Sequence, residues 1–257
     1  MRLLLSLPLG LLIGFALGSL GGGGSILTVP ALVYGMGLGA KSAVTTSLIV
    51  VGLTSLGGAI GHWRAGRVRV AAGFWFGIAG IVGSLVGSRL NRAVDPHVLL
   101  IAFSGLMLLA AWRMWHSTRS TAPSAAARTG ERSRLKVVVS VLVAGTVVGF
   151  MTGFFGVGGG FIIVPALVLA LRFDMPVAVG TSLLVIAVNS ATALASRLAT
   201  TGVDWKVAIP FTVAGLAGAF LGNRVAGRAR SGALVKWFVV LLVGLAAYTL
   251  LRSIPGL

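Results

Sequence analysis

Two kinds of group in this chain are suited to holding a ligand, and each occurs twice. A Thr-Ser pair stands in AVTTSLIV at 43–50 and again in AVGTSLLV at 178–185. A run of glycines precedes VPALV at 29–33 and at 164–168. Hydroxyls donate hydrogen bonds to an oxyanion, and glycine lets a ligand come close to backbone N–H groups. These residue types point to non-covalent binding of an anion.

A single offset relates the two copies of each pattern. Pro30 and Pro165 stand 135 residues apart, and the same offset pairs Ser47 with Ser182 without a gap. Two halves that each contain a glycine-broken apolar segment at the same place are typical of membrane transporters, which bind their substrate between the repeats.

The composition requires a membrane protein. The chain of 257 residues is 57% hydrophobic and 10% charged, whereas soluble domains average about 25% charged residues. The apolar runs approach or reach the roughly 17–25 residues that a helix needs to span a bilayer, and they lack the alternation of a barrel strand. These runs are 43–61, 70–88, 97–112, 136–155, 177–196, 207–222 and 233–251. We therefore predict an all-α polytopic membrane protein.

The positions of the charged residues also indicate a membrane protein. The net charge of +17 comes from 21 Lys and Arg against four acids, and the basic residues stand almost wholly between the apolar runs. Loop charges of this kind orient a membrane protein. We therefore predict the lipid bilayer as a partner and no nucleic acid.

Nothing in the sequence indicates an enzyme. The chain has no cysteine, which excludes disulfides and thiolate ligands. It also lacks the H-E-x-x-H and G-x-S-x-G patterns of a metal-dependent or serine hydrolase. We predict no catalytic residue, no metal and no cofactor.

The N-terminal segment 1–20 has the composition of a signal peptide, with a basic start and an apolar middle. However, Gly14 and Gly18 match Gly149 and Gly153 inside the second half. We therefore predict that this segment belongs to the folded protein.

One linker divides the chain. Residues 116–134 are polar, basic and rich in Pro, Ser and Ala, which predicts a disordered loop on the cytoplasmic side. The predicted organisation is membrane repeat 1 at 1–115, a cytoplasmic basic linker at 116–135, and membrane repeat 2 at 136–257.

The first apolar region of each half is too long for one span. A helix over 3–38 would measure about 54 Å, whereas the pieces after the glycines, 25–38 and 160–171, would measure only about 21 and 18 Å. We predict a glycine-broken helical hairpin followed by three transmembrane helices in each half, or roughly 8–10 membrane segments. The four basic residues of 224–236 favour the cytoplasm. Only inverted repeats place them there, so we favour inverted over parallel halves, with both termini outside.

The glycine breaks form the first candidate site. Non-helical backbone at membrane depth is tolerated only where it is buried in protein or lines a cavity. A short helix that begins after such a break presents free N–H groups and a positive dipole end to an anion. The alternative is tight helix packing through small residues. The predicted substrate-binding residues here are Gly22, Gly23, Gly24, Ser25, Gly158, Gly159 and Gly160.

The hydroxyl pairs form the second candidate site. Their alternative roles are to cap a helix or to hydrogen-bond within it. Asn189 stands in an apolar run, either as a polar contact between helices or as a ligand group. The predicted substrate-binding residues of this second set are Thr45, Thr46, Ser47, Thr181, Ser182 and Asn189.

Acidic residues are scarce, and all four (Asp95, Glu131, Asp174 and Asp204) are predicted in loops. Proton- and cation-coupled carriers commonly place a carboxylate inside the membrane. The apolar runs of this chain are predicted to contain no such carboxylate. This argues against a cationic substrate and agrees with an anionic one.

The remaining charged or titratable groups are predicted to be structural. His62, His97 and His116 fall near span ends, where we expect interfacial histidines. Arg89 and Arg224 recur at the offset, and we expect them to extend to the interface, with anion attraction as the alternative.

The glycine-rich stretch that runs into V-P-A-L and the A-V-x-T-S-L signature resemble the TauE/SafE family of sulfite exporters. The matching stretches are Gly156–Leu167, the looser Gly21–Leu32, Ala43–Leu48 and Ala178–Leu183. The resemblance covers nearly the whole chain apart from the linker. It implies a carrier of sulfur-containing anions, such as sulfite or sulfonates.

The first half departs from the second at Lys41, which replaces Pro176. Lys41 either adds positive charge near the site entrance or is a simple loop lysine.

We expect a multi-pass protein of the inner (plasma) membrane that carries small anions by alternating access at a midplane site. The expected anions are sulfite, sulfonates or related sulfur oxyanions. The alternatives are a passive anion channel and a non-transporting scaffold, and a homo-oligomer stays open.

Overall fold

The chain folds into helices. The computed structural model describes residues 2–91, 94, 96–119, 134–155, 160–197 and 202–253, and these ranges contain no strand. The elements are α1 (Arg2–Leu20), α2 (Gly23–Pro30), the π-helical turn η1 (Ala31–Gly35), α3 (Ala40–Arg64), α4 (Val70–Asn91), α5 (Pro96–Arg119), α6 (Arg134–Phe155), α7 (Gly160–Leu169), α8 (Met175–Arg197), α9 (Trp205–Arg228) and α10 (Ser231–Ser253). Six of the described helices, namely α3, α4, α6, α8, α9 and α10, are long and apolar enough to cross a membrane. The predicted all-α polytopic fold is confirmed.

The predicted short helix occurs in each half. α1 ends at Leu20, and Gly21 then adopts a φ of +74°, which favours glycine. α2 begins two residues later and passes into η1 directly after Pro30. Proline lacks the N–H for a regular helical hydrogen bond and its ring crowds the preceding turn, but Pro165 at the equivalent place lies within the regular helix α7. In the second half the corresponding helix α7 has only 10 residues.

The helices of the two halves interlock. α1 packs along α9, and in the same way α6 packs along α4. Glycines permit the close approach. A Cβ atom added to Gly10 would lie 2.6 Å from the carbonyl oxygen of Phe211, and one added to Gly145 would lie 2.6 Å from that of Phe76. The offset relates these two pairs, so the same interface is built twice, each time between different halves.

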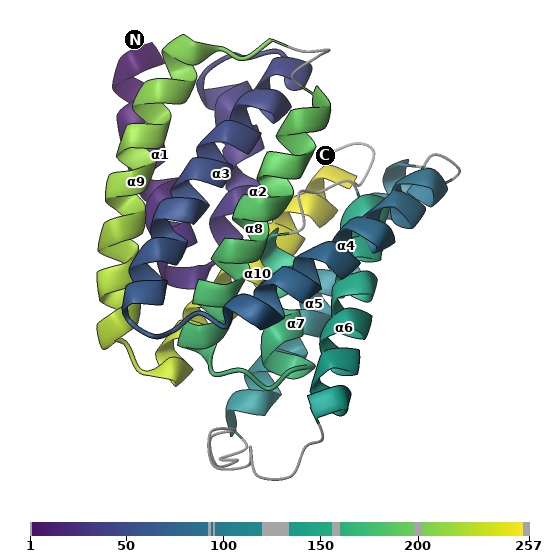
Figure 1. The fold of residues 1–257 in the computed structure, drawn as a ribbon. Coiled ribbons are helices and arrows are strands. Elements are labelled where there is room, and N and C mark those ends of the chain that lie inside the picture. The colour runs from purple at the N-terminus through teal and green to yellow at the C-terminus, as the bar shows by residue number, and fades with distance from the viewer. Residues whose placement is uncertain are drawn as a thin grey trace.

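The equivalent helices α3 and α8 pack against each other in opposite directions. The Cβ position of Gly52 lies 3.1 Å from the Cβ of Ser190, and that of Gly58 lies 3.1 Å from the Cδ1 of Leu183. Later residues of α3 thus meet earlier residues of α8. Figure 1 shows α3 beginning at the upper end of the view and α8 at the lower end. The inverted arrangement of the repeats in a membrane stays a prediction, and this packing supports it.

The division into repeats does not produce two separately packed units. Fully buried side chains from both halves, such as Leu17, Phe76, Phe161 and Phe238, belong to one core. α5 continues to Arg119 and α6 begins at Arg134, so both helices extend into the predicted linker. Residues 120–133 lie outside the described residues, and the predicted domain boundaries stay a prediction.

Candidate functional site

The two glycine breaks meet in the structure. Gly22 lies against the backbone of Gly160, so closely that a side chain on Gly22 would overlap the Gly160 carbonyl group. A Cβ on Gly21 would lie 2.5 Å from the Ser182 Oγ, and one on Gly160 would overlap the Ser25 Oγ. Five positions on three helices and one turn therefore converge. Four of them were predicted as site residues, and the fifth, Gly21, is adjacent to the predicted Gly22. We call this group (Gly21, Gly22, Ser25, Gly160 and Ser182) the glycine crossing.

The hydroxyls of the glycine crossing are bonded locally. Ser25 Oγ donates to the Gly22 carbonyl oxygen at 2.6 Å, and Ser182 Oγ donates to the Val179 carbonyl oxygen at 2.8 Å. Ser182 is fully buried. Because a hydroxyl hydrogen rotates about its C–O bond, either group can donate instead to an oxyanion that reaches the crossing.

The remaining predicted glycines have other surroundings. Gly23 faces the side chain of Leu241, and a Cβ on Gly24 would lie 2.6 Å from the carbonyl oxygen of Ile13. Both therefore serve close packing in this conformation. Gly158 and Gly159 lie outside the described residues.

Two helices begin at the glycine crossing. α2 begins at Gly23 and α7 at Gly160, so two positive dipole ends with free N–H groups face the same region. In the part of the chain that the structure describes, the only acids are Asp174 and Asp204, which lie outside helices as predicted. Two converging helix N-termini without a nearby carboxylate in the described elements favour an anion.

Thr46 and Thr181 join the two halves reciprocally. The backbone N–H of Arg69 donates to Thr181 Oγ1 at 3.1 Å, and that of Asp204 donates to Thr46 Oγ1 at 3.3 Å. The offset pairs both the threonines and their donors. We call these two hydrogen bonds the threonine contacts. They assign these hydroxyls to contacts between the halves in this conformation.

The other hydroxyls of the predicted set bond inside their own helix. Thr45 Oγ1 donates to the Lys41 carbonyl oxygen at 3.2 Å, and Ser47 Oγ donates to the Val44 carbonyl oxygen at 2.7 Å. Such bonds within a helix are the alternative role expected for these residue types.

In the described part of the chain, buried side-chain oxygens without a hydrogen-bond partner occur on α3, α8 and α9. The oxygens without a hydrogen-bond partner are Thr54 Oγ1, Ser55 Oγ, Asn189 Oδ1 and Thr212 Oγ1. Thr54 and Ser55 are at most 1% exposed. A buried oxygen without a partner costs about 1–3 kcal/mol, so these atoms are suited to a ligand or a water molecule. Sequence reasoning identified only Asn189, although the offset pairs it with Thr54.

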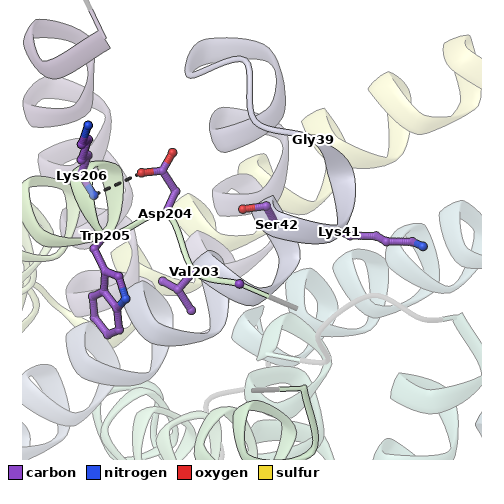
Figure 2. A pocket seen from close by; sticks show the side chains of 8 residues that line it. Gly39, Lys41, Ser42, Val203, Asp204, Trp205 and Lys206 are labelled. Atoms are coloured by element: carbon purple, nitrogen blue, oxygen red, sulfur yellow. Dashed lines mark hydrogen bonds between the residues drawn. The ribbon is translucent and has the colours of Figure 1, made fainter. Parts of the chain in front are cut away.

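An open cavity of about 1010 Å³ lies where α3 and α9 begin. Lys41, Ser42, Asp204 and Lys206 are among the residues that line it, and the Thr46 contact lies just beyond. Figure 2 shows the Asp204 carboxylate directed at the backbone of Lys206, with the Lys41 side chain extending away from it. Lys41 thus lies in the first turn of α3 at the rim of a cavity.

His62 lies near the end of α3, where the sequence places it, and its depth at the membrane interface stays a prediction. Its side chain is fully buried, and its Nε2 lies 3.0 Å from the carbonyl oxygen of Gly18. His116 is exposed, and the side chain of His97 is outside the described part. Arg224 is exposed, with its guanidinium 4.4 Å from the centre of the Phe220 ring.

Two interlocked apolar repeats with broken helices that meet between them define a polytopic membrane protein with transporter architecture. Comparison with known families agrees, since the model described as "Sulfite exporter TauE/SafE" matches residues 6–249. The chain belongs to the TauE/SafE family of membrane transporters.

Similar proteins are named as membrane transporters. A "Probable membrane transporter protein" of Xylella fastidiosa (strain 9a5c) is 34% identical over 254 residues, which cover 98% of this chain and 96% of the relative. The "Probable membrane transporter protein YunE" of Bacillus subtilis is 26% identical, with 95% of both chains covered. The predicted family and the multi-pass membrane class are confirmed.

Proposed function

We propose that this protein carries small anions, with sulfite, sulfonates or related sulfur oxyanions as the substrate class, across the inner (plasma) membrane. The observation that carries the proposal is the glycine crossing. Two helix N-termini and the Ser25 and Ser182 hydroxyls converge there between the two repeats. The family description "Sulfite exporter TauE/SafE" supports the sulfur-anion class.

Alternating access is the proposed mechanism. α3 and α8 run in opposite directions and Thr46 and Thr181 both lie near the start of their helix. The two threonine contacts are therefore at opposite ends of the α3–α8 pair. Loosening one contact while the other holds would open the glycine crossing to one side at a time. The cavity beside the Thr46 contact supports an opening at that end, and Lys41 and Lys206 at its rim would attract anions.

A flux assay tests the proposal. We expect purified protein in liposomes to transport labelled sulfite in a saturable manner. Ser182→Ala removes one hydroxyl donor to the charged substrate, which contributes about 1.5–3 kcal/mol and thus about 10- to 100-fold in apparent affinity. Ser88→Ala is the matched control, because Ser88 Oγ also donates three residues back, to Leu85 at 3.0 Å, on an exposed part of α4.

The alternatives give different results. Flux that neither saturates nor accelerates with sulfite on the opposite side would indicate a passive channel. Equal effects of the two serine substitutions would remove Ser182 from the site. The absence of any anion flux, with protein correctly inserted, would leave the scaffold alternative.

A further inference from the structure

A small basic cavity lies where α3 and α9 end, apart from the glycine crossing. Its volume is about 300 Å³, and it is lined by Ala65, Arg67, Asn223, Arg224, Gly227 and Arg228. We call it the arginine pocket. It joins the two halves, since Arg67 lies between α3 and α4 and the polar residues opposite it lie on α9.

The charge of the arginine pocket favours an anion. Three of its six lining residues are arginines and none is acidic. Guanidinium groups present a planar fork of N–H donors that matches a phosphate group, and the Asn223 amide adds a further donor. Repulsion among three cations in one small cavity is relieved when an oxyanion binds between them.

The backbone at Gly227 makes room for this arrangement. The two terminal nitrogens of Arg67 lie 3.0 and 3.1 Å from the position of a Cβ on Gly227. A side chain at this position would displace the guanidinium group. Arg67 is half-buried, whereas the neighbouring Arg64 and Arg230 are exposed and do not line the pocket.

The surface beside the arginine pocket is apolar and outward-facing. Phe220, Leu221 and Val225 lie on α9 beside the pocket arginines Arg224 and Arg228 and are 45–56% exposed. Trp63, near the end of α3, is 62% exposed, as is typical of a tryptophan at the membrane–water interface. An anion in the pocket that also carries acyl chains would lay those chains along this face of α9.

We propose that the arginine pocket binds the phosphate headgroup of an anionic phospholipid, with Arg67, Arg224 and Arg228 as its ligands. The lipid would bridge the α3–α4 connection of the first half and α9 of the second. This connection is the segment that holds the Thr181 contact, because Arg69 donates its N–H to Thr181. A bound lipid would therefore stabilise the closed form of that contact.

The test compares lipid binding to variants of equal charge. Full-length protein in detergent is titrated with phosphatidylglycerol or phosphatidylcholine, and bound lipid is measured by native mass spectrometry. The pocket variant is Arg67→Gln with Arg228→Gln, and the matched control is Arg64→Gln with Arg230→Gln. We expect the pocket variant to bind phosphatidylglycerol about 150-fold more weakly, which corresponds to the loss of two hydrogen bonds to a charged group at about 1.5 kcal/mol each. The control should bind like the wild type.

A second variant keeps every charge. Gly227→Leu fills the space that the Arg67 guanidinium occupies, so it should also weaken phosphatidylglycerol binding. This variant tests the role of the pocket even if the double variant does not fold.

Equal loss in the pocket and control variants would overturn the proposal in favour of general surface charge. Inorganic phosphate or sulfite that displaces the lipid at equal concentration would also overturn it, in favour of a site for soluble oxyanions. Because the readout is lipid binding, neither result depends on sulfite transport.

Discussion

The role of each buried hydroxyl in this protein depends on which hydrogen-bonding group of a neighbouring segment it faces. Thr45 and Thr46 are neighbours in α3 and are both fully buried, yet only Thr46 accepts a hydrogen bond from the other half. The difference arises because consecutive helical residues face different directions. The threonine contacts therefore depend on the position of each hydroxyl rather than on its residue type.

Replacing Thr181 tests the threonine contacts. Thr181→Val keeps the shape of the side chain but leaves the Arg69 N–H without its acceptor, at a cost of about 1 kcal/mol. We expect hydrogen exchange at the Arg69 amide to accelerate about fivefold. Thr181→Ser should restore protection. Thr45→Val is the matched control, since Thr45 bonds only within α3, and acceleration at Arg69 in that variant would refute a specific role for Thr181.

Some of these roles were accessible from the sequence and others were not. The offset paired Thr46 with Thr181 and Ser47 with Ser182. It did not reveal the donors, because Arg69 and Asp204 have unlike side chains and use only their backbone N–H groups. Backbone donors leave no signature in residue type, and the partner of a buried side chain depends on tertiary packing.

At the scale of helices, glycine determines which elements can approach each other. Gly14 and Gly18 lie against the backbone of Gly215 and Ala219, so that α1 and α9 are in close contact over several turns. The sequence repeat predicted recurring glycines on these helices. It did not predict that α1 would choose a partner from the other half, because small residues specify close packing without specifying the partner.

A pair of alanine substitutions tests this packing. A Cβ on Gly149 would overlap the carbonyl oxygen of Gly80, so Gly149→Ala must separate α6 from α4. Overpacking of this kind typically costs about 1–3 kcal/mol, and we expect a lower melting temperature in detergent. Gly105→Ala is the control, because a Cβ there meets nothing within 4 Å and alanine favours the helix. Equal destabilisation by both substitutions would contradict the packing role of Gly149.

For the molecule as a whole, the orientation of the halves decides whether one site can open to both sides. Inverted repeats give the two ends of the α3–α8 pair equivalent contacts, which alternating access requires. The arginine pocket supports this orientation, since it brings Arg67 of the first half to the end of α9. Parallel repeats would place those two segments on opposite sides of the membrane.

Cysteine labelling of intact cells tests the orientation directly. The natural chain has no cysteine, so each introduced thiol is the only reporter. Inverted repeats predict that Arg64→Cys and Arg230→Cys react with a membrane-impermeant maleimide only after permeabilisation, because both flank the arginine pocket on the predicted cytoplasmic side. Lys206→Cys, at the opposite end of α9, should react without permeabilisation. Parallel repeats predict that Lys206→Cys and Arg64→Cys behave alike and that Arg230→Cys differs from both. That result would remove the symmetry on which alternating access at the glycine crossing depends.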